Sequence, residues 1–200
     1  RPACGAHKIP PREVPEMEYH DLITHRRSLR VYDSRIPARE VILSCLEAAR
    51  VAPSGENVQP WRFTVIDEPD LRTELAEAAT GGIYLPTKFI RKAPVIIAVS
   101  AKTDIMVNRI GTFLQGTQFY LLDLGMACQQ LVLRAEDLGL GSCYIGWFNV
   151  EKARRVLALP KQEKLVCLIS LGYPPPEYTK PEGHKRKALD EIVRFNREKS

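Results

Sequence analysis

The sequence lacks long apolar runs, paired cysteines and metal-binding patterns. Its longest apolar stretches are interrupted by Arg, Asp or Gln before they reach the roughly 18 residues that a membrane helix requires. Its five cysteines include no C-x-x-C pair, and its four histidines have no ligand-like spacing. Cysteines scattered through apolar segments are typical of small buried side chains in a reducing compartment. We therefore expect no membrane contact, no metal, no disulfide and a cytoplasmic location.

Several catalytic signatures are also absent. The sequence contains no G-x-x-x-x-G-K-[ST], no G-x-S-x-G and no H-E-x-x-H. The stretch "LGLGSCYIG", residues 138–146, looks at first like a dinucleotide-binding fingerprint. Tyr144 stands where the third glycine is required, however, and the stretch follows a predicted helix instead of a strand. A Rossmann-type nucleotide site is therefore excluded.

The net charge of +5 comes mainly from two basic clusters, "HRRSLR" at 25–30 and "GHKRK" at 183–187. Elsewhere basic and acidic residues alternate as on an ordinary solvated surface. The chain has no long basic helix, no zinc-finger spacing and no RNP-type aromatic motif, so we expect no nucleic-acid binding. Two compact clusters far apart in sequence suit one small anion, such as a phosphate group.

Length and composition suit one domain. Two hundred residues with 44% hydrophobic content can fill a single core, which we place over residues 17–200. Residues 1–16 are rich in Pro and charge and have no apolar signal core, so they form an extended lead-in. Because the chain begins at Arg1, we expect further residues upstream, and an export signal among them is left open.

The periodicity of apolar residues predicts an α+β sandwich with few strands and many helices. Helices are expected over 17–26, 38–52, 69–79, 112–138, 149–159 and 189–196, and strands over 61–67, 93–101 and 164–174. Glycine-rich turns are expected at 80–89 and 139–146. The helix over 112–138 is apolar on nearly all sides, so we expect it both in the core and at a subunit interface.

Three sets of residues suit a flat cofactor that carries a phosphate. Arg26, Ser28 and Arg30 alternate, so in extended backbone they point the same way and could bind a phosphate. Asn57 and Gln59 lie in a polar bend, where their amides could bond a ring or its side chain. Glycines between residues 139 and 146 allow backbone donors to approach the ring edge.

In combination these stretches resemble the nitroreductase family of FMN-dependent oxidoreductases. The resemblance rests on "RRSLRVY" (26–32), "APSGENVQPW" (52–61), the long helix from Asp123 to Gly141, and "SCYIG" followed later by "LGYP". It covers most of the chain. It implies a three-layer sandwich with a mixed central sheet flanked by helices, and an obligate homodimer with the long helix and two FMN molecules at its interface.

The resemblance also assigns roles to individual residues. Arg26 and Ser28 would bind the phosphate, Arg186 would close on it with a contribution from Lys185 or Lys187 left open, and Arg30 would lie near N1 and O2 of the flavin. The bend would reach the flavin held mainly by the other subunit, and residues 144–146 would line the ring near N5. The full candidate cofactor-binding set is Arg26, Arg27, Ser28, Arg30, Pro53, Ser54, Gly55, Asn57, Gln59, Tyr144, Ile145, Gly146, Lys185 and Arg186.

Two positions depart from the family pattern. The basic stretch reads His184, Lys185, Arg186 where relatives often carry K-x-R, so its lysine register is open. Ile145 replaces the glutamate that some classes place beside the flavin.

The implied activity is ping-pong hydride transfer through flavin N5, with NADH or NADPH as donor and a nitroaromatic, quinone or related compound as acceptor. The flavin carries the chemistry, so no catalytic side chain is assigned. The alternative is a flavin-binding or flavin-storage protein without nucleotide turnover. We find none of the extra lid motifs of dehalogenating relatives, and the short segment 101–111 suggests an open or partner-completed pocket.

Five residues invite structural explanations. We expect Arg27 to be solvated or to cap a helix rather than contact flavin, Trp61 to pack into the core, and Asp123 to be a hydrogen-bonded structural acid. Trp147 fits core packing and a substrate cavity equally well. Cys143 has no neighbouring feature in the sequence that would lower its pKa, so we do not expect a redox thiol.

Overall fold

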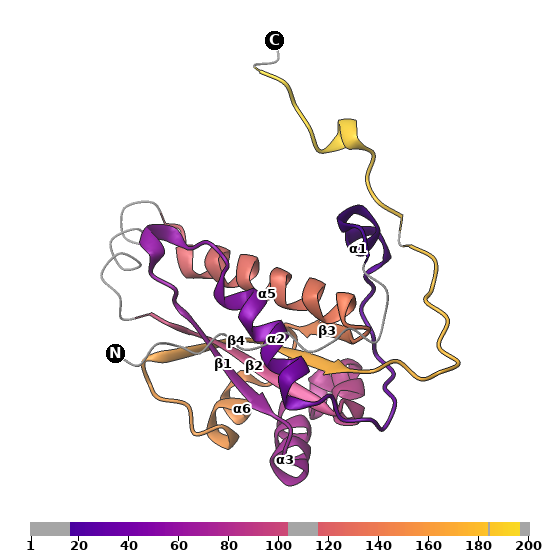
Figure 1. The fold of residues 1–200 in the computed structure, drawn as a ribbon. Helices are drawn as coiled ribbons and strands as arrows, with labels where there is room; N and C mark the ends of the chain where they lie inside the picture. The colour runs from indigo at the N-terminus through magenta and orange to yellow at the C-terminus, as the bar shows by residue number, and fades with distance from the viewer. Residues whose placement is uncertain (1–16, 104–115, 184, 197–200) are drawn as a thin grey trace.

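The computed structural model describes residues 17–103, 116–183 and 185–196, and its centre is a four-stranded sheet (Figure 1). The strands are β1 (Trp61–Ile66), β2 (Val95–Lys102), β3 (Gly141–Ile145) and β4 (Glu163–Gly172), in the order β1-β2-β4-β3. All three neighbouring pairs are antiparallel. Strands β2 and β3 do run in the same direction, but β4 lies between them.

The α+β class is confirmed, and the sheet is less mixed than expected. Because β4 separates the two strands of like direction, these form no parallel ladder with each other. Within the described ranges, parallel pairing is limited to an isolated bridge between Ser28 and Ser142 at the β3 edge.

Helices cover both faces of the sheet, giving three layers (Figure 1). One face packs against α2 (Arg39–Arg50) and α5 (Phe119–Asp137), and the other against α3 (Pro69–Ala79), η2 (Gly82–Lys92) and α6 (Val150–Val156). Helix α1 (Tyr19–His25) contacts α5. The last described element is η3 (Leu189–Glu191), on a C-terminal arm that leaves the body of the molecule.

Strand β2 explains why both layers are needed. Val95, Ile97 and Val99 lie in the core under α2 and α5, whereas Ile96 and Ala98 lie in the core under α3 and α6. Side chains of a strand alternate between faces, so a continuous apolar run requires cover on both sides. Trp61 is 7% exposed in the first of these cores, which confirms its expected packing.

The structure corrects four expected elements. Helix α5 begins at Phe119, and residues 116–118 are not helical; residues 112–115 lie outside the described part of the chain. Residues 141–145 form strand β3 where a turn was expected, and residues 82–92 are helical instead of a bend. The expected helix over 189–196 is reduced to the single turn η3, since the arm packs against no core formed by the described residues.

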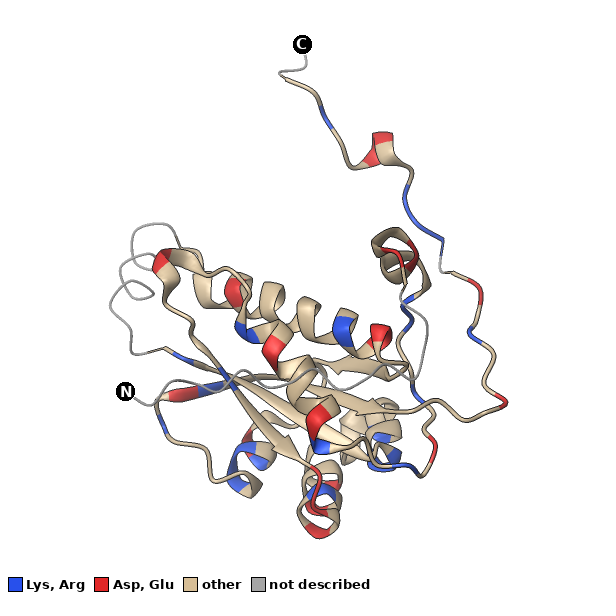
Figure 2. Ribbon diagram, viewed as in Figure 1, with Lys and Arg blue, Asp and Glu red and all other residues tan. Residues whose placement is uncertain are grey.

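Charged side chains lie mainly on the helices and the arm. In Figure 2 basic and acidic residues alternate along α2, whereas α3 carries mainly acidic and α6 mainly basic residues. Among the described residues, no helix is both long enough and apolar enough to cross a membrane. The lead-in proposed for residues 1–16 lies outside the described ranges.

Candidate functional site

The first group of candidate residues lies on the β3 edge of the sheet. The backbone N–H of Leu29 donates to the carbonyl oxygen of Ser142 at 2.9 Å, next to the Ser28–Ser142 bridge. The Leu29 side chain is 3% exposed. Gly141 permits this close approach, because a Cβ atom there would lie 2.2 Å from Cδ2 of Leu29. The segment 26–30 is therefore held against β3 by both backbone bonding and packing.

Arg26, Ser28 and Arg30 converge on the Cys143 thiol. Burial raises the pKa of Cys143, while the positive charge of Arg30, hydrogen bonding from Ser28 and the charge of Arg26 oppose that rise. Burial prevails, so the thiol stays protonated at neutral pH, as expected of a structural cysteine. The three side chains therefore lie near one thiol, in keeping with their alternation in the sequence, and their binding of a phosphate stays a prediction.

Arg30 is held from a second side. Its guanidinium lies over the ring of Phe89, 5.8 Å from the ring centroid. A cation–π contact of this kind restricts the side chain and favours the charged group over the ring. Nothing in the sequence pointed to Phe89, because it comes from η2, far from residues 26–30 in the chain.

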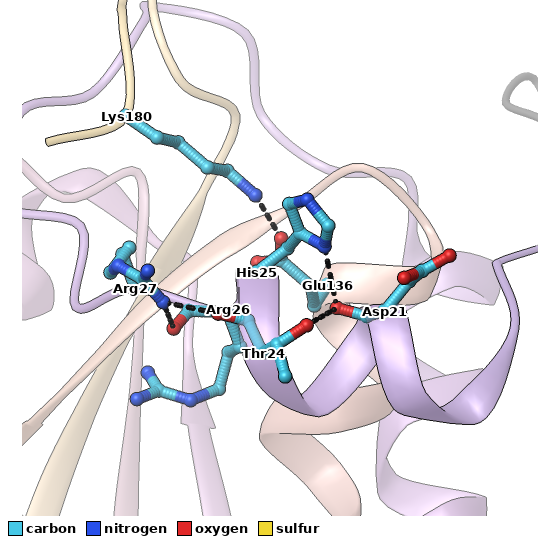
Figure 3. Close-up of polar contacts among 7 residues, drawn as sticks. All are labelled: Asp21, Thr24, His25, Arg26, Arg27, Glu136 and Lys180. Atoms are coloured by element: carbon cyan, nitrogen blue, oxygen red, sulfur yellow. Dashed lines mark hydrogen bonds and ion pairs between the residues drawn. The ribbon is translucent and has the colours of Figure 1, made fainter. Parts of the chain in front are cut away.

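Arg27 has a different environment from its neighbours. Its Nη1 donates to the carbonyl oxygens of Thr24 at 2.5 Å and of Arg26 at 3.0 Å, where α1 ends (Figure 3). This confirms the expected helix-capping role, because the last carbonyls of a helix lack partners within it. Its Nε is buried without a hydrogen-bond partner.

The second group is the bend between α2 and β1. Its backbone is left-handed at Glu56, Asn57 and Gln59, with φ values of 49°, 52° and 48°. Ser54 accepts twice, its carbonyl from the N–H of Asn57 and its Oγ from the N–H of Gln59, both at 3.0 Å. The Gln59 amide donates to Oδ1 of Asn57, also at 3.0 Å. Each left-handed non-glycine residue costs about 1–2 kcal/mol, and such strain concentrates at functional sites.

Asp123 ties this bend to α5. Its side chain is 4% exposed, and Oδ1 accepts a hydrogen bond of 3.0 Å from the backbone N–H of Gly55. The expectation of a hydrogen-bonded structural acid is confirmed. The sequence did not identify Gly55 as the hydrogen-bond donor. It did indicate that a donor exists, because an acid on the inner face of an apolar helix needs one.

The two groups occupy opposite edges of the sheet. The bend leads into the edge strand β1, and residues 26–30 lie along the other edge strand, β3. Three inter-strand spacings separate these edges, about 14 Å. The bend is also fixed near the start of α5, whereas residues 26–30 lie near its end (Figure 1). One chain alone therefore does not bring all candidate residues together.

Residues 144–147 follow the β3 edge away from residues 26–30. The Ile145 side chain is 1% exposed in the core, so it could meet a ligand only through its backbone. A Cβ at Gly146 would meet nothing within 4 Å, which leaves open space beside the chain. Tyr144 is 40% exposed.

Trp147 is 58% exposed, so core packing is wrong for this residue. Its Nε1 donates to the carbonyl of Ile83 at 3.2 Å, and its ring is tilted against Tyr84 with centroids 5.3 Å apart. The indole is thus fixed by η2 while its face stays open.

Lys185 and Arg186 lie on the C-terminal arm and are exposed. The arm passes close to Arg27, since a Cβ at Gly183 would lie 2.8 Å from Nη2 of Arg27. His184, part of the uncertain register, lies outside the described residues. The arrangement brings the basic stretch into the neighbourhood of residues 26–30, but which residue contacts a phosphate stays a prediction. Most of segment 101–111, expected to border the pocket, is likewise outside the described ranges.

The described cysteines are free thiols. Cys45, Cys128, Cys143 and Cys167 are free, and burial raises the pKa of Cys45 to about 12. Within the described ranges no group of three His, Cys, Asp or Glu side chains could hold a metal ion.

Known proteins share this sandwich, and they define its class. An FMN-dependent nitroreductase from Clostridium difficile superposes with a TM-score of 0.71 at 26% identity, over 89% of this chain and 99% of that one. A putative NADH dehydrogenase/NAD(P)H nitroreductase from Archaeoglobus fulgidus is 32% identical over 177 residues, 86% of this chain and 95% of that protein. Mouse iodotyrosine deiodinase 1 is 29% identical over 202 residues, 88% of this chain and 68% of that protein.

The family model for nitroreductases matches residues 23–83 and 84–173. The chain belongs to the nitroreductase family. It is therefore an oxidoreductase of a family that generally depends on flavin and NAD(P)H.

Proposed function

We propose that the protein is an FMN-dependent oxidoreductase that uses NADH or NADPH to reduce small aromatic acceptors such as nitroaromatics and quinones. We further propose that it works as an obligate homodimer in the cytoplasm, with two FMN sites, each built from both chains. The observation that carries the proposal is the separation of the two candidate groups on opposite edges of one sheet. A second copy related by a two-fold axis supplies to each site the group that its own chain holds elsewhere.

The residues at the β3 edge fit FMN. Arg26 and Ser28 would hold the phosphate, with Lys185 or Arg186 added from the arm, since guanidinium and hydroxyl donors suit phosphate oxygens. Arg30, fixed over Phe89, would lie at the N1 and O2 side of the ring. The open space at Gly146 allows a flat ring to approach the backbone, flanked by Tyr144 and the backbone of Ile145.

The bend fits the opposite side of the ring. Gly55 also faces open space, and its N–H is fixed by Asp123. Pro53 and the polar side chains of Ser54, Asn57 and Gln59 would complete the partner's site. A bend whose left-handed residues are locked by internal hydrogen bonds presents these groups with little further loss of conformational entropy.

Two exposed apolar surfaces support a second copy of the chain. On the outer side of α5, Leu121, Leu122 and Met126 are 43%, 57% and 39% exposed beside Gly125. On the arm, Leu189 and Phe195 are 72% and 86% exposed. Contiguous apolar surface of this kind marks an interface. Gly125 would allow two helices to approach closely.

When bound, FMN supplies the chemistry by accepting a hydride from the nucleotide and passing electrons to the acceptor. The protein's part is to hold the ring, to leave one face open, and to place positive charge where the reduced ring becomes negative. Arg30 performs the last task electrostatically. The exposed face of Trp147 near Gly146 offers a planar surface for an aromatic acceptor.

The first test is an absorbance spectrum from about 300 to 550 nm of the purified protein, repeated without oxygen after addition of NADH and then NADPH. We expect bound flavin whose absorbance at the longest wavelengths is lost with at least one nucleotide. Bound flavin that stays oxidised with both would support the alternative, flavin storage without nucleotide turnover. Protein that binds no FMN would overturn both.

Acceptors are tested in the second half-reaction. After reduction, a nitroaromatic, a quinone and an iodinated tyrosine are added separately, and reoxidation is timed. The iodinated tyrosine is included because of the likeness to iodotyrosine deiodinase. We expect the nitroaromatic or the quinone to reoxidise the flavin fastest. Release of iodide as the fastest reaction would instead assign dehalogenation.

A further inference from the structure

A cavity of about 430 Å³ lies on the other side of the segment 26–30. It is lined by residues just before and just after α1, by the end of α5 and the start of β3, and by the loop 174–180. Apolar walls come from Met17, Leu29, Leu140 and Pro174, and Tyr178 completes the lining. Its volume is in the range of small-molecule sites.

The cavity is distinct from the candidate flavin site. Arg27 and Leu29 line it, whereas Arg26, Ser28 and Arg30 converge on Cys143. Side chains alternate along extended backbone, so the two sets face opposite ways. A molecule in the cavity would therefore not occupy the proposed FMN phosphate position.

Arg27 provides an unsatisfied donor in this lining. Its Nη1 is occupied by two carbonyl oxygens at the end of α1, but its Nε is buried with no partner (Figure 3). A buried donor without an acceptor is destabilising, more so on a charged group.

The net charge of the cavity lining indicates which ligand charge it favours. Glu136, whose side chain is 6% exposed, accepts a hydrogen bond from Lys180, so these two charges compensate each other (Figure 3). The Arg27 guanidinium then leaves one net positive charge in the lining. A monoanion would neutralise it, whereas a phosphate dianion would leave excess negative charge near Glu136 and apolar walls.

We propose that this cavity binds a monocarboxylic acid with an apolar body, its carboxylate held by the positive charge of the Arg27 guanidinium. The apolar body packs between Leu29, Leu140 and Pro174. Recognition thus combines one ion pair with burial of apolar surface. The site is independent of the proposed redox chemistry.

The test uses 3-phenylpropionate as probe and its neutral amide as matched control, titrated by calorimetry into the purified protein with its cofactor saturated. We expect saturable binding of the acid with a Kd below about 1 mM. The amide should bind at least about tenfold more weakly. Equal binding of acid and amide would overturn the assignment of Arg27, and no saturable binding of the acid would overturn the site.

Charge variants give results of opposite sign. Arg27→Met should raise the Kd of the acid about ten- to a hundredfold, because it removes the positively charged partner of the carboxylate. Lys180→Ala should also lower the affinity for the acid, since the negative charge of Glu136 is left uncompensated. Glu136→Gln should raise that affinity. The control Arg155→Met, an exposed arginine on α6, should bind as the parent does. An acid affinity that follows none of these signs contradicts the proposal.

One more variant tests the site without changing Arg27, in case Arg27→Met disturbs folding. Met17→Trp enlarges a partly exposed wall residue next to the cavity, so it should block the acid while the melting temperature stays near that of the parent. Competition with FMN provides the remaining check. If the acid is displaced by FMN, it binds in the candidate flavin site and the proposal fails.

Discussion

The two halves of the candidate site are built in different ways. Residues 26–30 are held to β3 by a backbone hydrogen bond, an isolated bridge and the tight contact of Leu29 with Gly141. Among the described residues no strand lies beside the bend at 53–59, which depends on internal hydrogen bonds and on the carboxylate of Asp123. The β3 half is therefore fixed by packing, and the bend half by a few polar contacts.

This difference predicts how each half fails. Steric substitutions should disrupt the β3 half, because the sheet cannot shift without losing its ladder with β4. Polar substitutions should detach the bend while the sheet remains intact. In each case flavin binding should fall, but only the first failure should cost much global stability.

Gly141→Ala should have the largest effect. The new Cβ would lie 2.2 Å from Cδ2 and 2.6 Å from Cβ of Leu29, so backbone must move. We expect a loss of about 3 kcal/mol in the free energy of unfolding, measured by urea denaturation of the flavin-free protein. Gly146→Ala, with open space around the added atom, is the matched control and should change stability by less than about 0.5 kcal/mol. Similar losses in both variants would refute the packing argument.

Asp123→Ala should detach the bend. It removes the acceptor of the Gly55 N–H and a buried hydrogen-bonding group, so we expect a loss of about 2 kcal/mol in unfolding free energy. Asp123→Asn keeps an acceptor oxygen and should recover more than half of that loss. FMN affinity, titrated by fluorescence, should fall in the Ala variant although the phosphate cluster is untouched. Unchanged affinity would remove the bend from the site.

The sequence predicted the layers of the fold better than its edges. The positions of α2, α3, α6, β1, β2 and β4 follow from apolar periodicity, because burial on one or two faces imposes it. Strand β3 was missed since its glycine-rich sequence has low strand propensity and forms only because Leu29 and β4 pack against it. The C-terminal helix was predicted too long, because an amphipathic pattern forms a helix only where it has a surface to pack against.

For the candidate site, the sequence predicted which side chains share a face but not what fixes them. Alternation placed Arg26, Ser28 and Arg30 together, and the structure agrees. The contacts of Arg30 with Phe89 and of Asp123 with Gly55 join residues that are distant in the chain, so no local pattern could show them. The exposure of Trp147 likewise depends on η2, which the sequence indicated only as a bend.

Arg30→Ala tests the β3 half without disturbing its packing. Under the proposed function it removes positive charge from the side of the flavin that becomes negative on reduction. We expect the midpoint potential of the bound flavin to become more negative by about 30–60 mV, which for two electrons corresponds to a ten- to hundredfold change. Arg155→Ala on α6 is the control and should leave the potential as in the parent. An unchanged potential in Arg30→Ala would contradict the role of Arg30.

Glu56→Gly should have the smallest effect and the opposite sign. Glu56 is exposed and left-handed, with φ of 49°, and glycine adopts that conformation without steric cost. Glycine also raises the entropy of the unfolded chain, so we expect a net gain of only about 0.5 kcal/mol. The measurement is the urea midpoint of the flavin-free protein.

Glu74→Gly, on an exposed position inside α3, makes the same replacement in right-handed backbone and should lose about 1 kcal/mol. A loss of stability in both variants would mean that the left-handed bend is not strained by its side chain. If Glu56→Gly is more stable but binds FMN less tightly, the strain of the bend serves to hold its polar groups in place for the ligand, since a relaxed bend must then be ordered on binding.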